Sequence, residues 1–339
     1  MKITILLVIA VFAVLATGVP APRKSAFINK EIVDAIRKSG ATWEAYDPEE
    51  NPLRKYSDDE LRHFLGVPGM DPAATLAGIK NAQLHMPKAG GRTLNINEPS
   101  KATINVAASF DWRTSADGTR CKPNVLTQGS CGGCYSFTTA EVFAARYCQA
   151  KSGASAVDFS PQDILACNSR TTGCGGGVLD LAFGYLEDYG ITTLACRPYQ
   201  ESNTPDTGAS LSQKCLANKC ADGTTVTKYF CKKGTSIILY GTTRIQNEIS
   251  LRGPLGTQMT AYSDLLNYKS GIYTQTTGTN QGGHAVVLIG WGTDGTTPYW
   301  IVQNSWGTDW GESGYFKANM ADTKAGVGGA AYYCVPETS

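Results

Sequence analysis

The stretch of sequence that decides the fold is Gln128-Gly129-Ser130-Cys131-Gly132-Gly133-Cys134-Tyr135-Ser136-Phe137. Beyond it apolar residues recur with helical spacing, and this pattern predicts a helix over Cys134–Ala150. The start of a helix collects unpaired backbone N–H groups and the positive end of the helix dipole, and both favour a thiolate over a thiol. Cys134 is therefore a candidate nucleophile.

A nucleophilic cysteine needs a base, and histidine is scarce in this chain. Two of its three histidines, His63 and His85, lie in the first quarter, which leaves His284 alone in the rest of the sequence. We therefore pair His284 with Cys134. Asn304, on the next strand but one, is the group expected to fix the far nitrogen of the His284 ring.

An oxyanion that develops beside the nucleophile needs hydrogen-bond donors. Gln128 precedes Cys134 by six residues, and its side-chain amide is a candidate donor next to the backbone N–H of Cys134.

Three other interpretations of Cys134 compete with the nucleophile. With Cys131 it forms a C-x-x-C pair, but a redox pair normally follows a strand in a βαβ unit, which this sequence does not show. Half of a metal site would need a second close pair of ligands, and the spacing from Cys215 to Cys220 is too wide. A purely structural cysteine is the third. The odd cysteine count and the single available histidine favour the nucleophile, and no metal or cofactor is expected.

The composition restricts the class of protein. A net charge of +1 over 339 residues offers no basic surface for nucleic acid. The first 18 residues combine Lys2, a short apolar core and the small residues Ala16-Thr17-Gly18. This pattern is typical of a secretory signal, and its core is too short for a membrane span. All eleven cysteines lie from Cys121 onward, which in an oxidising compartment predicts disulfides and, because eleven is odd, at least one unpaired thiol.

The chain divides into a signal over residues 1–18, a leader over 19–105 and a body over 106–339. The leader has no cysteine and two helical patterns, over 28–39 and 57–65, followed by a linker-like stretch over 86–105. It is either an accessory packed on the body or a partly disordered segment.

The body shows helical patterns first and strand patterns second, which indicates an α+β fold with two lobes. Helices are expected over 134–150, 160–167 and 179–189, and strands over 236–240, 256–261, 285–290, 299–303 and 314–317.

Residues 128–135 resemble the nucleophile motif of the papain-like cysteine proteases. Two further stretches, 283–292 and 304–311, resemble the His and Asn motifs of that family, and 167–177 resembles its cysteine-glycine loop. Gly133 and Tyr135 depart from the usual motif, which has Ser or Ala and Trp at these positions. Segments 108–112, 196–199 and 262–273, together with the short leader over 27–67, resemble the cathepsin B-like branch.

The resemblance implies a zymogen whose leader lies across the active-site cleft until it is removed. The body would have the papain-like two-lobed fold. A helical lobe over about 121–200 would carry Cys134, and a β-barrel-like lobe over about 210–320 would carry His284 and Asn304. Protein and peptide substrates would bind between the lobes.

The same resemblance assigns roles to individual residues. Cys134 would attack the peptide carbonyl, His284 would protonate the leaving amine, Asn304 would orient His284, and Gln128 would help to hold the oxyanion. Trp306 would shield the Asn304–His284 hydrogen bond from water, although an ordinary core aromatic fits its sequence equally well.

Substrate contacts and disulfides follow from the resemblance too. Gly176 and Gly177 would let the substrate backbone approach closely, unless they are simple turn glycines. Ala330 falls at the floor of the second substrate subsite, where cathepsin B itself carries an acid. The implied disulfides are Cys131–Cys174, Cys121–Cys148, Cys167–Cys215, Cys196–Cys220 and, only by elimination, Cys231–Cys334.

We therefore expect a monomeric cysteine endopeptidase of the secretory pathway, in a lysosome or vacuole or outside the cell. Its own propeptide would inhibit it, and cystatin-type inhibitors are candidate partners. Residues 200–214 contain no histidine, whereas cathepsin B-like enzymes that remove dipeptides from C-termini have a histidine pair in that loop. The alternative is a catalytically inactive homologue that acts as a binding protein.

Overall fold

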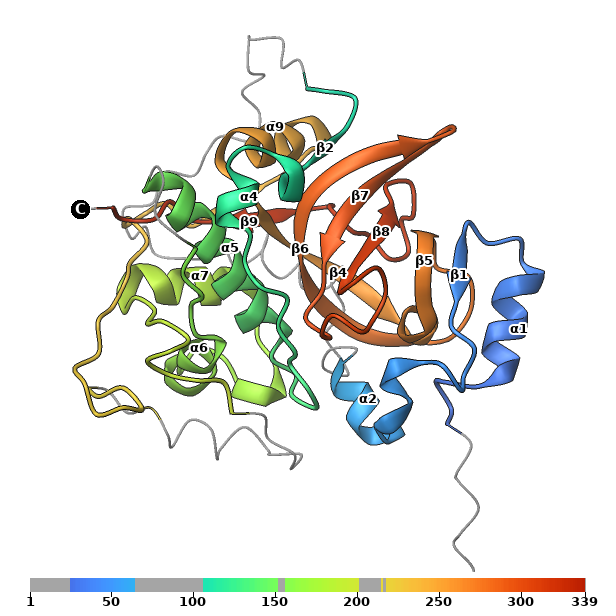
Figure 1. Ribbon diagram of the computed structural model, residues 1–339, viewed down its shortest axis with the longest axis horizontal. Coiled ribbons are helices and arrows are strands. Elements are labelled where there is room, and N and C mark those ends of the chain that lie inside the picture. Colours follow the sequence, from blue (N-terminus) through green and yellow to red (C-terminus); the bar gives the residue numbers. More distant parts are fainter. Residues whose placement is uncertain (1–24, 65–105, 152–155, 201–214, 216–217, 339) are drawn as a thin grey trace, which may run out of the picture.

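The computed structural model describes residues 25–64, 106–151, 156–200, 215 and 218–338. Helices of the body gather on one side and long strands on the other, while the leader lies against the outer side of the strands (Figure 1). This is the α+β arrangement expected from the order of the sequence patterns.

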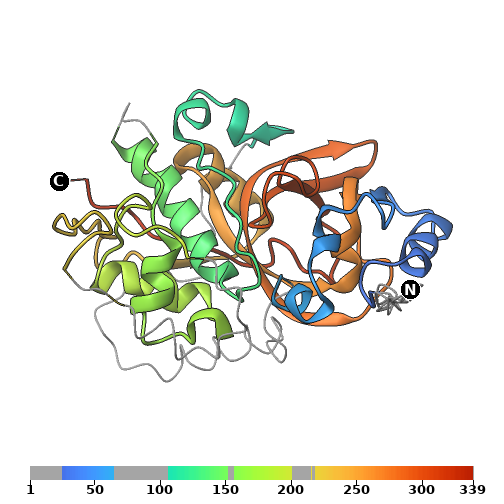
Figure 2. The same ribbon diagram turned by 60° about the horizontal axis from the view of Figure 1, so that its bottom comes forward.

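The helical side is built around α5 (Cys134–Ala150), which begins and ends where the apolar spacing predicted. Most of its side chains are buried, polar ones included, because helices cover one flank and strands β4 and β6 the other. Figure 2 shows this helix running along the boundary between the two sides. The position of α5 explains why its first residue can meet groups carried by the strands.

The neighbouring helices follow their sequence signals. α6 (Pro161–Cys167) is capped by Ser160, whose hydroxyl accepts the N–H of Asp163 at 3.1 Å. α7 (Leu179–Asp188) ends just before Gly190, which has φ +67°. The shorter elements are α4 (Gly118–Cys121), η1 (Pro52–Lys55), η2 (Trp112–Thr114), η3 (Gly173–Gly175) and η4 (Ser263–Asn267).

The strands form one curved sheet of nine strands in the order β1-β5-β8-β7-β6-β4-β9-β3, with β2 paired to β6. Among the described residues this path does not close into a barrel. All pairings are antiparallel except that of β5 with β8. The bounds are β1 (Trp43–Ala45), β2 (Phe110–Asp111), β3 (Ile237–Leu239), β4 (Leu255–Tyr262), β5 (Tyr268–Tyr273), β6 (Asn280–Asp294), β7 (Thr297–Gln303), β8 (Tyr315–Asn319) and β9 (Ala331–Tyr333).

The sequence did not predict several elements of the body, among them α4, β2, α9, β5 and β9. α9 (Thr242–Arg252) interrupts the run of strands; it has no side-chain cap, and Ile245 and Ile249 are its only buried apolar residues. β5 contains Gly271 at φ +92°, which breaks the alternation typical of a strand. β9 has three residues, all buried, too few to show a period.

The described part of the leader packs on the body, the first of the two alternatives open at the sequence level. It contains α1 (Lys30–Lys38), β1 and α2 (Asp58–Phe64). β1 pairs with β5, and Gly271 makes this possible, because a Cβ there would lie 2.7 Å from the carbonyl oxygen of Thr42. Trp43 then packs on Tyr268 and Tyr273 at centroid distances of 6.0 and 5.3 Å. The linker-like stretch over 86–105 lies outside the described residues.

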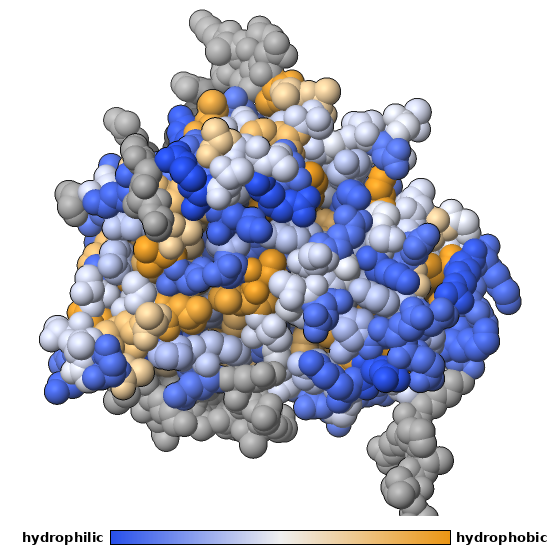
Figure 3. All heavy atoms as spheres, viewed as in Figure 1, coloured by the Kyte–Doolittle hydropathy of each residue, from blue (hydrophilic) through white to orange (hydrophobic). Residues whose placement is uncertain are grey.

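The outer face of the leader is polar. Hydrophilic residues gather over α1 (Figure 3), where Lys30 pairs with Asp34 and Arg37 with Asp47. Within the residues that the structure describes, no helix is both long and apolar enough to cross a bilayer.

Candidate active site

Cys134 is the first residue of α5 and the one cysteine of the described chain outside a disulfide. Its residue is 6% exposed, and the backbone N–H groups of Ala285 and Tyr135 act to lower the pKa of its thiol. The turn before it is fixed by the Cys131–Cys174 disulfide and by a 3.1 Å bond from the Gly132 N–H to the Cys174 carbonyl. The C-x-x-C pair is therefore not a bridge, because Cys131 is bound elsewhere.

His284 lies on β6, a strand that packs against α5, and its neighbour Ala285 is the residue whose backbone N–H lowers the pKa of Cys134. Its side chain is 1% exposed, and Nε2 lies 2.8 Å from Oδ1 of Asn304. Asn304 directly follows β7, the strand adjacent to β6, and not the next strand but one as the sequence had suggested.

The hydrogen bonds of Asn304 decide which nitrogen of His284 carries a proton. The backbone N–H of Ser305 donates to Oδ1 of Asn304 at 2.9 Å. An N–H can only donate, so this atom must be the amide oxygen, and His284 must donate to it from Nε2. Nδ1 is left with the lone pair and has no hydrogen-bond partner among the described residues. The neutral ring can therefore accept a proton at Nδ1.

Trp306 covers this hydrogen bond. Its ring centroid lies 5.0 Å from that of His284, and it is almost completely buried. Its N–H has no partner among the described residues, so the ring acts here through its apolar surface. Trp310 packs edge-on against Trp306 at 4.7 Å and extends the cover.

Gln128 is held in place by the segment that follows Asn304. Its Oε1 accepts the hydroxyl of Ser305 at 2.6 Å, and its backbone N–H donates to the Ser305 carbonyl at 2.9 Å. The amide group is thereby turned so that Nε2 points toward Cys131 and the leader. Sequence reasoning did not single out Ser305; its position next to Asn304 was the available signal.

Burial controls the protonation of both reactive groups in this state. It raises the pKa of the Cys134 thiol to about 11, against the opposing effect of the Ala285 N–H. It lowers the pKa of His284 to about 4, against the opposing effect of the bond to Asn304. Each group alone is therefore neutral near pH 7, and a thiolate requires that the proton pass between them and create an ion pair.

The leader reaches this site with its last described residues. Nε2 of Gln128 lies 3.4 Å from the backbone carbonyl oxygen of His63. The ring of Phe64 packs edge-on against Trp306 at 6.0 Å. A leader carbonyl thus contacts the donor assigned to the oxyanion, a role for His63 that its sequence gave no sign of. His85 lies outside the described residues.

The two glycines expected to border the substrate differ in their surroundings. Gly176 has φ +114°, a conformation that other residues rarely adopt. At Gly177 a Cβ would lie 2.8 Å from the ring of Tyr135. The Tyr135 hydroxyl in turn donates to Oγ1 of Thr171 at 3.0 Å. At the unusual Gly133 a Cβ would meet the tip of Leu165 at 3.2 Å.

Ala330 directly precedes β9 and is 5% exposed. Its carbonyl accepts the hydroxyl of Thr257 at 2.7 Å, and Thr257 lies on β4, two residues before Met259, which pairs with His284. The backbone at Ala330 is thereby tied to the strand that pairs with the one carrying His284.

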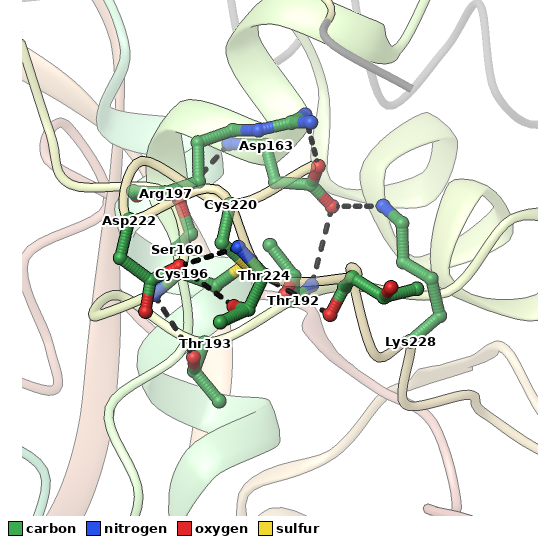
Figure 4. Close-up of a disulfide and its surroundings, with 11 residues drawn as sticks. Ser160, Asp163, Thr192, Thr193, Cys196, Arg197, Cys220, Asp222, Thr224 and Lys228 are labelled. Carbon is green, nitrogen blue, oxygen red and sulfur yellow. Dashed lines mark hydrogen bonds and ion pairs between the residues drawn. A yellow bond between two sulfur atoms is a disulfide. The ribbon is translucent and has the colours of Figure 1, made fainter. Parts of the chain in front are cut away.

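Five disulfides are present, Cys121–Cys148, Cys131–Cys174, Cys167–Cys215, Cys196–Cys220 and Cys231–Cys334, the same pairs that the resemblance implied. Next to Cys196 the buried carboxylate of Asp163 holds Arg197 and Lys228 (Figure 4). This cluster ties the loops after α7 to α6. Within the described ranges no group of three or more His, Cys, Asp or Glu side chains is placed to hold a metal ion.

Comparison with known proteins gives consistent matches. The sequence model of a family described as papain family cysteine protease matches residues 106–335. Cathepsin B-like CP3 of Giardia intestinalis is 38% identical over 222 residues, 65% of this chain and 71% of that protein. Cathepsin B-like CP1 of the same organism is 35% identical over 86% of this chain and 88% of its own length.

A solved structure also aligns with nearly the whole chain. Procathepsin B S9 of Trypanosoma congolense superimposes with a TM-score of 0.74 at 26% identity, covering 92% of this chain and 99% of that structure. The likeness therefore extends over the leader as well as the body.

Proposed function

The chain belongs to the papain family of cysteine proteases, with cathepsin B-like relatives, and we propose that it is an endopeptidase made as a secretory zymogen. Cys134 is the proposed nucleophile, His284 the acid and base, Asn304 the group that orients His284, and Gln128 the oxyanion donor. The observation that carries this assignment is the proton arrangement of His284, which leaves the lone pair of Nδ1 available, while Cys134 is the described cysteine outside a disulfide.

In the proposed reaction the thiol proton passes to Nδ1 of His284, and the thiolate attacks the carbonyl carbon of the scissile peptide. The carbonyl oxygen takes the negative charge and accepts hydrogen bonds from Nε2 of Gln128 and the N–H of Cys134. The C–N bond breaks as His284 returns the proton to the leaving amine, which leaves a thioester. Water then loses a proton to His284 and attacks the thioester carbon. The C–S bond breaks, which releases a carboxylic acid and returns Cys134 as a thiolate next to protonated His284.

An epoxide-type thiol inhibitor tests the assignment directly. The processed protein should be labelled at Cys134, and labelling should block peptide hydrolysis. The Cys134→Ala variant is the matched control and should neither label nor hydrolyse. A processed wild-type protein that is folded and fails to label would favour the inactive homologue that acts as a binding protein.

The leader is the proposed inhibitor of its own body. Support comes from the His63 carbonyl, which takes the hydrogen bond that Gln128 would give to a substrate, and from Phe64 on Trp306. The proposal also includes a signal over residues 1–18 and a leader over residues 19–105. It further includes a lysosomal, vacuolar or extracellular destination, a monomeric state and inhibition by cystatin-type proteins. Added in trans, a peptide spanning residues 25–64 should inhibit the processed enzyme.

The proposed preference for internal cleavage depends on the absence of histidine from residues 200–214. Residues 201–214 lie outside the described part of the structure, but the sequence from 200 to 214 contains no histidine. A substrate's free carboxylate would find no partner of that kind there. We propose internal cleavage with weak carboxydipeptidase activity. Dipeptide release that outpaces internal cleavage of a matched, C-terminally amidated peptide would contradict it.

Specificity at the second subsite is proposed to follow from Ala330. An apolar floor does not repay the desolvation of an arginine. Enclosing a Leu, Val or Phe side chain there gains about 1.5–3 kcal/mol. The enzyme should therefore prefer an apolar residue immediately before the one that donates the scissile carbonyl. Ala330→Glu should raise kcat/KM for Arg relative to Phe at that position. A wild-type preference for Arg would reject the assignment.

A further inference from the structure

Tyr135, the residue after Cys134, brings a hydroxyl to a position where the usual motif has a tryptophan, which carries none. The side chain is fully buried. Its hydroxyl nevertheless reaches two acceptors, Oγ1 of Thr171 at 3.0 Å and the backbone carbonyl of Gly173 at 3.2 Å. Burial raises the pKa of this hydroxyl above its usual value, so the group keeps the proton that it donates. None of the proposed catalytic roles uses this group.

Both acceptors belong to residues 171–177, called the glycine loop here, which lie between α6 and α7. The hydroxyl of Thr171 donates in turn to the carbonyl of Asn168 at 3.1 Å. Asn168 directly follows α6, and its side-chain amide donates to the carbonyl of Leu181 on α7 at 3.2 Å. The hydroxyl of Tyr135 thus connects the first turn of α5 with the glycine loop and, through it, with both neighbouring helices.

Gly177 packs against the same two side chains that share this hydrogen bond. A Cβ at Gly177 would lie 2.8 Å from the ring of Tyr135 and 2.8 Å from Cγ2 of Thr171. Gly177 is only partly buried, whereas the tyrosine that it rests on is inaccessible. Tyr135 therefore supports the glycine loop from its inner side.

The other bonds of the glycine loop fix its shape and its middle. The Gly176 carbonyl accepts both the N–H and the hydroxyl of Thr172, each at 2.9 Å, and these bonds stay within the loop. Cys174 is tied to the segment before the nucleophile by its disulfide to Cys131. Tyr135 adds contacts near the two ends of the loop, a hydrogen bond at one end and its ring at the other.

We propose that Tyr135 is a positioning residue, whose hydroxyl fixes the glycine loop so that Gly176 and Gly177 meet the substrate backbone in a set position. This inference rests on the proposed function, because it requires a peptide substrate that runs along these two glycines, as the family resemblance implies. A loop that is already ordered needs no further ordering when substrate binds. Loss of the hydroxyl should therefore weaken substrate binding.

Tyr135→Phe tests the proposal in the processed enzyme, because it removes the hydroxyl and keeps the ring. KM for a peptide substrate should rise by about 3- to 10-fold, the effect of one ordinary hydrogen bond, while kcat stays within about 2-fold of wild type. The rate of Cys134 alkylation by iodoacetamide should not change, since this small reagent does not extend along the glycine loop. The combination distinguishes a displaced loop from a damaged nucleophile.

Tyr273→Phe is the matched control. It also removes the hydroxyl of a fully buried tyrosine, which donates to Oδ1 of Asp264 at 2.7 Å on the β side, outside the glycine loop. It should lower the melting temperature and leave KM and the alkylation rate unchanged.

Thr171→Val removes the acceptor and keeps the shape of the side chain. It should also raise KM, which keeps the test decisive if Tyr135→Phe does not fold. In the double variant the two increases in KM should not multiply, because both changes remove the same hydrogen bond.

The outcomes separate this inference from the proposed function. A folded Tyr135→Phe with wild-type KM would overturn the positioning role, as would Thr171→Val with wild-type KM where Tyr135→Phe does not fold; wild-type turnover leaves the catalytic assignment intact. Slower alkylation together with a lower kcat would also overturn it, because the hydroxyl would then act on the nucleophile. A wild-type enzyme that neither labels at Cys134 nor hydrolyses peptides would overturn the catalytic assignment and the positioning role with it.

Discussion

The helical and β sides of this protein hold their parts of the proposed active site in different ways. The chain from 232 to 333 contains no cysteine, and β4 to β8 all lie within it. The cysteines lie before this segment or at its end, and four of the disulfides staple the helical side. Short helices and loops bury little surface of their own and gain from cross-links, whereas long strands supply their own long-range hydrogen bonds.

The proposed catalytic residues lie where these two kinds of support adjoin. Cys134 stands next to a disulfide at the start of α5, while His284 and Asn304 depend on the pairing of β6 with β7. Catalysis requires that both supports place their groups to within a fraction of an ångström. The two sides can therefore be perturbed separately and compared.

Removing the reactive group of either side should have the largest effect. Cys134→Ala and His284→Ala should each lower kcat/KM by about 10⁴-fold or more, since neither group functions without the other. For the same reason the double variant should be no slower than the worse single variant. Measurement of kcat/KM on one peptide for all three variants checks this, and multiplicative losses in the double variant would mean that the groups act independently.

Removing the disulfide beside Cys134 should lower the stability of the fold and have little effect on the reaction itself. The Cys131–Cys174 bridge spans 43 residues, and a closed loop of that length stabilises the fold by about 4 kcal/mol in the chain-entropy account. Replacing both cysteines by Ser should lower the free energy of unfolding by that order, as measured in urea.

The loss of one hydrogen bond on the β side provides the comparison for the Cys131–Cys174 disulfide. Tyr273→Phe removes the 2.7 Å hydrogen bond to Asp264 and should cost only about 1–3 kcal/mol. An equal or larger loss for Tyr273→Phe would mean that the cross-links are not what holds the helical side.

Removing the leader should change the reactivity of the thiol. In the leader-bound form the pKa of Cys134 is raised to about 11 and that of His284 is lowered to about 4, both through burial. A raised thiol pKa delays the loss of the proton to higher pH, so alkylation of the zymogen should be slow at pH 6. The processed enzyme, with a hydrated thiolate–imidazolium pair, should react about 100-fold faster at that pH.

Iodoacetamide labelling of the zymogen and the processed protein across pH 4–11 measures the difference. The zymogen rate should rise only toward the alkaline end, while the processed enzyme should already react at acidic pH. Coincident profiles would show that the leader does not influence the ionisation of the thiol.

Two glycines beside the nucleophile should give the smallest and most selective effects. Gly177→Ala would push its Cβ to 2.8 Å from the ring of Tyr135 and should destabilise the protein by about 1–3 kcal/mol. Gly133→Ala meets only the flexible end of Leu165 and the Cys131 sulfur at 3.2 Å, and should cost less than about 1 kcal/mol. Melting temperatures compare the two, and the reverse order would mean that Leu165 cannot move.

Local signals in the sequence determined a large part of this structure. The apolar period placed both ends of α5, and Ser160 with Pro161 marked the start of α6. Both signals depend on residues that are close in the sequence, so they can be recognised without knowledge of the fold. Composition limited the reactive groups in the same way, since one histidine remained for one spare thiol.

The tertiary structure decided what depends on residues far apart in the chain. The protonated nitrogen of His284 follows from the bond between Ser305 and Asn304, and Ser305 also orients Gln128 across 177 positions. Leader residue His63 reaches that amide, and Gly271 admits β1 to the sheet. The spacing of apolar residues and the capping residues of helices reflect only residues that are close along the chain. The contacts named here form only after strands and helices have packed and brought distant side chains within 3–4 Å.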